Sequence, residues 1–136
     1  MISFDVIRSE IEAEMPEASP LERAAAFVHA SEQVLENWIE SHDGVPTQEE
    51  KEGSRLLALH RQGAKGDPSF NACRETCREL VYRYNVIKSD DPETDEVKML
   101  KMMRLLARHI FFFISGKLQE AKLGEFCCSS KPLRLN

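Results

Sequence analysis

The sequence lacks a long apolar run, and this absence excludes several classes of protein. In its most apolar segment, the uncharged stretch covers only residues 110–116 of 136. A membrane-spanning helix needs roughly 20 apolar residues. The first fifteen residues contain four acidic residues and no apolar run, so we expect no secretory signal peptide. The sequence therefore predicts a cytoplasmic protein that has no membrane partner.

The sequence also has little positive charge and no recognisable catalytic motif. It contains 18 Lys and Arg against 23 Asp and Glu, for a net charge of −5. This balance disfavours a general affinity for nucleic acid. We find no phosphate-binding glycine loop, nucleophile elbow or His-Glu-x-x-His zinc motif. We therefore expect a protein that is not an enzyme and uses no cofactor.

The four cysteines permit one metal hypothesis. Cys73 and Cys77 are four residues apart on an expected helix, so both thiols face the same side, and His60 lies on the apolar stripe of the preceding helix. Zinc favours such sulfur and nitrogen ligands, with Cys127 or Cys128 as a possible fourth. The simpler interpretation is core packing, because free cysteine is among the most buried residue types. A metal-binding or redox protein is therefore the alternative hypothesis.

Helical periodicity is what the sequence has in abundance, and no stretch alternates as a strand does. Ser3 is expected to cap a short first helix that ends before Pro16. A second helix is expected to begin at Ser19, followed by Pro20 at the first helical position. Glu22 completes a capping box with Ser19.

Three further helices are expected, and each begins at a capping residue. Thr47 with Glu50 forms a second capping box. Asp67 and Asp91 each precede a proline that suits the first helical position. Because the expected connections are short, about 3–6 residues, consecutive helices should pack as antiparallel neighbours.

These signals together predict the fold class and the domain limits. We expect an all-α, up-and-down antiparallel bundle of four long helices plus a shorter N-terminal helix. Gly124 is expected to end the last helix. Residues 1–124 would then form a single helical-bundle domain, and residues 125–136 an irregular C-terminal tail.

The helix expected over residues 97–118 has a basic face opposite its apolar face. Its basic residues are Lys98, Lys101, Arg104 and Arg108. Such a stripe is usually solvated or paired with neighbouring acidic helices. As a functional surface it would suit an acidic protein partner better than nucleic acid, because no base-reading residues are interleaved with it. Lys101, Arg104 and Arg108 are therefore candidate interface residues.

The second half of the same helix is apolar on all sides between residues 110 and 114. Phe111 and Phe112 point away from the core face, so either another helix of the chain or a second subunit must cover them. We expect a second subunit, because two-fold homodimers are the commonest assembly. The main functional hypothesis is a small bacterial helical-bundle protein that binds another protein, in an adaptor, inhibitor or immunity-type role. It would form a homodimer through residues 97–118.

A third hypothesis comes from Arg104 and His109, which are separated by four residues. This spacing resembles the motif of the HEPN ribonucleases, which are also helical bundles. The resemblance implies RNA cleavage by these two side chains. Leu105 stands where that family usually has a polar residue, and a regular helix places the two side chains about 140° apart.

Overall fold

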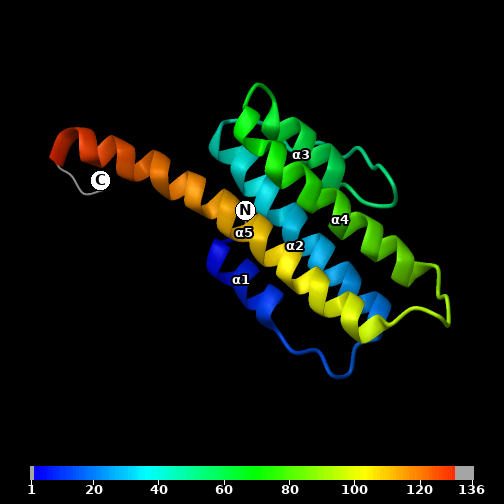
Figure 1. The fold of residues 1–136 in the computed structure, drawn as a ribbon. Coiled ribbons are helices and arrows are strands. Elements are labelled where there is room, and N and C mark those ends of the chain that lie inside the picture. Colours follow the sequence, from blue (N-terminus) through cyan, green and yellow to red (C-terminus); the bar gives the residue numbers. More distant parts are fainter. Residues whose placement is uncertain (1, 131–136) are drawn as a thin grey trace.

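The computed structural model describes residues 2–130, with side chains for residues 2–121, and these residues form a helical chain (Figure 1). Its elements are α1 (Phe4–Glu12), α2 (Pro20–Ser41), α3 (Leu56–Ala64), the 3₁₀ turn η1 (Pro68–Phe70), α4 (Asn71–Lys88) and α5 (Glu96–Ser130). The described residues contain no strand, only an isolated bridge between Lys51 and Ser54. The predicted all-α fold class is confirmed.

Helices α2 and α5 lie at the centre of the arrangement. Helix α2 contacts all four other α-helices, and α5 contacts α1, α2 and α4. The colour order in Figure 1 shows that α2 and α5 run in one direction and α4 in the opposite one. The last turns of α5 extend beyond the other helices. The predicted core face of α5 is fully buried at Met103, Ile110 and Ile114.

Two of the predicted helix starts are present with the expected caps. The hydroxyl of Ser3 accepts a hydrogen bond from the backbone N–H of Val6 at 3.3 Å. Ser19 and Glu22 make both bonds of the capping box, at 3.1 and 2.8 Å. The backbone N–H of Ser19 donates to the Glu22 carboxylate and lowers its pKa. These starts were predictable because each cap involves residues only three positions apart.

The third helix is shorter than predicted, because residues 47–55 form a loop. Lys51 and Ser54 pair across Glu52 and Gly53, whose φ angles are 56° and 89°. Two successive residues with positive φ are typical of a type I′ turn, in which glycine is favoured. The prediction that this helix begins at Thr47 was therefore wrong, since α3 begins at Leu56. Residues 2–130 form three long α-helices, of 22, 18 and 35 residues, and two α-helices of nine residues, whereas the sequence predicted four long helices and one short one.

The limits of the last helix also differ from the prediction. Asp91 caps only a turn, and α5 begins after Asp95, whose carboxylate accepts from the N–H of Lys98 at 3.1 Å. Helix α5 continues past Gly124 to Ser130. A glycine inside a helix costs only about 1 kcal/mol relative to alanine and blocks no hydrogen bond. The predicted tail therefore overlaps the helix, and residues 131–136 lie outside the described residues.

The loop is attached to α2 through a buried carboxylate, which makes stability depend on pH. Glu32 is 8% exposed and accepts a hydrogen bond from the backbone N–H of Arg55 at 2.7 Å. Burial raises the pKa of Glu32 above its usual 4.5. The folded state therefore binds this proton more tightly than the unfolded state, and the contribution of Glu32 to stability falls as pH rises through the raised pKa.

We expect Glu32→Gln to be more stable than the wild type at pH 7, because glutamine keeps an acceptor for Arg55 without a buried charge. The difference should shrink as the pH approaches 4.5, the unfolded value. Urea unfolding at several pH values measures it. Glu40→Gln, at an exposed position of α2, is the control and should show no such trend. A Glu32→Gln advantage that grows towards low pH would contradict this account.

Candidate functional site

The two phenylalanines expected to need a second subunit have different surroundings. Phe111 is only 6% exposed and packs edge-to-face against Phe4 of α1, with 5.6 Å between ring centroids. Helix α1 of the same chain therefore covers Phe111, where we had expected a second subunit. Phe112 remains 50% exposed, with the guanidinium of Arg8 5.3 Å from its ring centroid.

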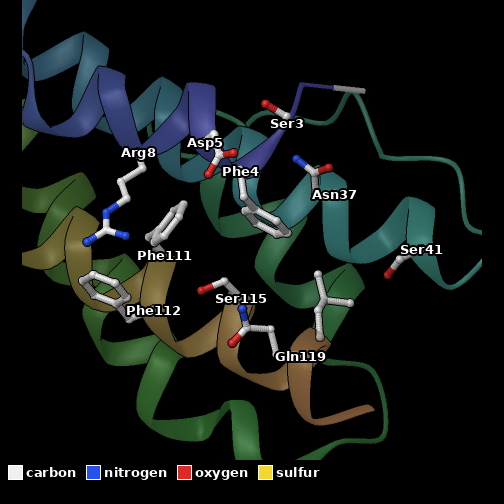
Figure 2. Close-up of a pocket in the computed structure, with 11 residues that line it drawn as sticks. Ser3, Phe4, Asp5, Arg8, Asn37, Ser41, Phe111, Phe112, Ser115 and Gln119 are labelled. Atoms are coloured by element: carbon white, nitrogen blue, oxygen red, sulfur yellow. The ribbon is translucent and has the colours of Figure 1, made fainter. Parts of the chain in front are cut away.

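Beside these rings, α1, α2 and α5 enclose a groove of about 610 Å³ (Figure 2). Figure 2 shows the rings of Phe4 and Phe111 between α1 and α5, and Phe112 next to the Arg8 guanidinium. Asn37 of α2 contributes an amide to the lining. An apolar groove with a few polar groups is a typical binding site. We call it the α1–α5 groove.

One side of α5 is only partly covered by the rest of the described chain. It comprises Leu105, His109, Phe112 and Gly116, which recur at helical spacing, and we call it the outer α5 face. Leu105 is 52% exposed and Phe112 is 50% exposed. A Cβ atom added to Gly116 would meet no atom of the described residues within 4 Å. This face is therefore partly apolar and open to close approach.

Two of the four residues of the predicted basic stripe, Arg104 and Arg108, are engaged within the chain. Arg104 donates from Nε and Nη2 to the carbonyl oxygens of Ile11 and Ala13, at 3.0 and 2.8 Å. Arg108 donates to the carboxylate of Glu12 at 2.6 Å, which lowers the pKa of Glu12. These bonds hold the C-terminal end of α1, whose last carbonyls have no partner within the helix. The sequence could not indicate the contacts of Arg104, because its two acceptors are backbone atoms more than 90 residues away.

The other two residues of the stripe and the two residues of the ribonuclease-like spacing have different surroundings. Lys98 and Lys101 are exposed, so they alone of the stripe are available to an acidic partner. Arg104 is directed at α1, whereas His109 is exposed on the outer α5 face. The two residues of the ribonuclease-like spacing therefore do not form a joint site within the described structure.

The structure brings His60, Cys73 and Cys77 together in the core. A ring nitrogen of His60 and the two sulfur atoms all lie within 4.8 Å of one another. A hydrogen bond with Cys77 lowers the pKa of Cys73, which His60 lowers further. The same hydrogen bond and burial raise the pKa of Cys77. This hydrogen bond therefore favours the thiolate at Cys73 and the thiol at Cys77. The side chains of Cys127 and Cys128 lie outside those described.

Comparison of the chain with protein-family models, curated proteins and solved structures gave no match. None of the helices among the described residues is both long and apolar enough to cross a membrane. A functional assignment must therefore be argued from the chemistry and geometry of the groove, the outer α5 face and the cysteine cluster.

Proposed function

We propose that this chain is a non-enzymatic, protein-binding helical bundle of up-and-down antiparallel topology, and that it forms a homodimer through the outer α5 face and the adjoining α1–α5 groove. One observation carries the proposal. Leu105 and Phe112 are each half exposed on the same side of one helix, two turns apart, and Gly116 continues that side without a covering atom. Large apolar side chains gathered in this way are typical of an interface.

A second copy suits this surface for geometric reasons. A two-fold axis across α5 would place the outer α5 face of one copy against the same face of the other, which is the isologous contact of most dimers. The absence of a side chain at Gly116 allows two helix backbones to approach closely. The last turns of α5, which extend beyond the other helices, would then have a neighbour to pack against (Figure 1).

The expected energies indicate that the interface must include the groove. Covering half of a leucine or phenylalanine side chain contributes about 1 kcal/mol. The four such side chains of a symmetric dimer would contribute about 4 kcal/mol, whereas micromolar association needs about 8 kcal/mol. The remainder would come from the groove lining, where Leu118 and Phe4 offer further apolar surface and the exposed Gln119 offers hydrogen-bonding groups.

The test is the effect of one charge on the oligomeric state. We expect the wild type to sediment at twice the 15.5 kDa of the chain, and Phe112→Asp to sediment as a monomer with unchanged helix content. A carboxylate covered by the second copy loses its hydration, and this desolvation is costly even beside the Arg8 guanidinium. Analytical ultracentrifugation between about 1 and 100 μM, a range that brackets micromolar association, measures both, and circular dichroism checks the fold.

The matched control is Val45→Asp, since Val45 is 82% exposed in the connection between α2 and α3. It should leave the dimer intact. A wild type that stays monomeric over the whole concentration range would refute the dimer. A dimer that survives Phe112→Asp would show that another surface joins the copies.

A further inference from the structure

His60, Cys73 and Cys77 come from two helices and converge on one buried point. His60 lies on α3 and is 4% exposed, while both cysteines lie on α4 and are 0% exposed. Their donor atoms, one nitrogen and two sulfurs, lie within 4.8 Å of one another. Core packing accounts for two small buried thiols. Packing against Phe70 also accounts for the burial of His60, but it does not require a ring nitrogen to lie within 4.8 Å of both sulfur atoms.

The ring of His60 is held in one tautomer. Its Nε2 lies 3.2 Å from the backbone carbonyl oxygen of Phe70. A carbonyl only accepts hydrogen bonds, so Nε2 carries the proton and the lone pair is on Nδ1. A histidine that binds a metal through one nitrogen almost always donates from the other to a carbonyl or carboxylate. The Phe70 carbonyl therefore provides the support that a metal-binding histidine requires.

We propose that His60, Cys73 and Cys77 bind one thiophilic metal ion, Zn²⁺ or Cu⁺, through one nitrogen and two sulfur atoms. Thiolate and imidazole ligands select these ions over Mg²⁺ and Ca²⁺, which prefer oxygen. On binding, each thiol releases its proton to solvent as the metal–sulfur bond forms. Three ligands suffice for Cu⁺, whereas Zn²⁺ takes a water molecule as its fourth.

A cavity between α3 and α4 reaches the His60 side of the cluster. It has a volume of about 480 Å³, and its lining includes His60, Leu57 and Ala64 of α3 and Asn71 of α4. Neither cysteine lines this cavity, so metal uptake through it requires α3 to move against α4. The metal proposal does not depend on the proposed dimer, because all three ligands are buried within one chain.

The experiment begins with a background variant, Cys127→Ser with Cys128→Ser, which leaves Cys73 and Cys77 as the only thiols. This reduced protein, freed of metal, is titrated with Zn²⁺ and separately with Cu⁺ against a competing chelator. We expect one equivalent of ion per chain and a higher melting temperature with the ion bound. X-ray absorption at the metal edge should show two sulfur neighbours and one nitrogen neighbour from the protein.

Single ligand variants then locate the binding site. Cys73→Ser and His60→Gln should each weaken binding by more than about 100-fold, beyond the effect of losing a supporting hydrogen bond. His29→Gln is the control, since His29 is exposed on α2 and lies outside the cluster. Circular dichroism establishes that each variant folds before it is titrated.

Three outcomes would overturn the proposal. The first is that neither ion competes with a chelator of micromolar affinity. The second is that Cys73→Ser, folded as the background variant is, still binds one equivalent with unchanged affinity. The third is that X-ray absorption finds only oxygen and nitrogen neighbours.

Discussion

Phe70→Ala is expected to destabilise the protein by about 3–5 kcal/mol, because it removes the ring that joins three elements of the core. Phe70 is 1% exposed. Its ring centroid lies 5.3 Å from that of Trp38 on α2 and 5.5 Å from that of Phe113 on α5. The ammonium of Lys117 lies over all three rings, at 5.5–5.8 Å. Loss of the ring would therefore leave a cavity and disturb its neighbours together.

A loss of this size is large against the 5–15 kcal/mol that stabilises a typical domain. It should lower the melting temperature by about 10–15 °C. Urea unfolding followed by circular dichroism measures the free energy. Tyr82→Ala is the control, because Tyr82 is 62% exposed. This substitution should lower the free energy of unfolding by no more than about 0.5 kcal/mol. A Phe70→Ala variant as stable as Tyr82→Ala would mean that the site repacks without a cavity.

Arg104→Ala is expected to lower the free energy of unfolding by about 2–3 kcal/mol. It should also destabilise α1 more than the other helices. The guanidinium donates to two carbonyl oxygens at the end of α1 and lies 5.4 Å from the ring centroid of Phe27. Without it, the carbonyls of Ile11 and Ala13 lose their charged donor. Arg104→Lys should restore only part of the stability, because an ammonium lacks the planar fork that reaches both oxygens.

Hydrogen exchange locates this effect and urea unfolding gives its size. The amides of α1 should lose protection in Arg104→Ala, while those of α2 and α4 should change little. Lys101→Ala, at an exposed position on the same helix, is the control and should stay within about 0.5 kcal/mol of the wild type. Equal loss of protection in all helices would show that Arg104 stabilises the whole core and not α1 in particular.

Local signals predicted the helices well where the cap and its partner are close in sequence. Ser19 and Glu22 are an example, since both bonds of the capping box form within one turn. The same reasoning failed for Thr47, because Arg55 donates to its carbonyl oxygen and so holds the chain in a loop. A competing contact of this kind cannot be inferred from the capping residues alone. The sequence did contain one signal for a turn at this place, which is the glycine at position 53.

The candidate sites also combine features that are local in sequence with features that depend on the packing of distant segments. Periodicity predicted that Cys73 and Cys77 share a buried face, and both are fully buried. It did not decide whether His60 meets them, because that depends on how α3 packs against α4. The exposure of Phe112 and the burial of its neighbour Phe111 likewise depend on where α1 lies.

The sequence by itself therefore determined the all-α class, several helix starts and the buried face of α5, because these follow from periodicity and from contacts within one turn. Only the tertiary structure decided which basic residues of α5 are engaged and which of its phenylalanines is covered. It also decided where a nitrogen and two sulfur atoms converge. These features arise between segments that are distant in the chain, where backbone carbonyls and packing geometry leave no local pattern.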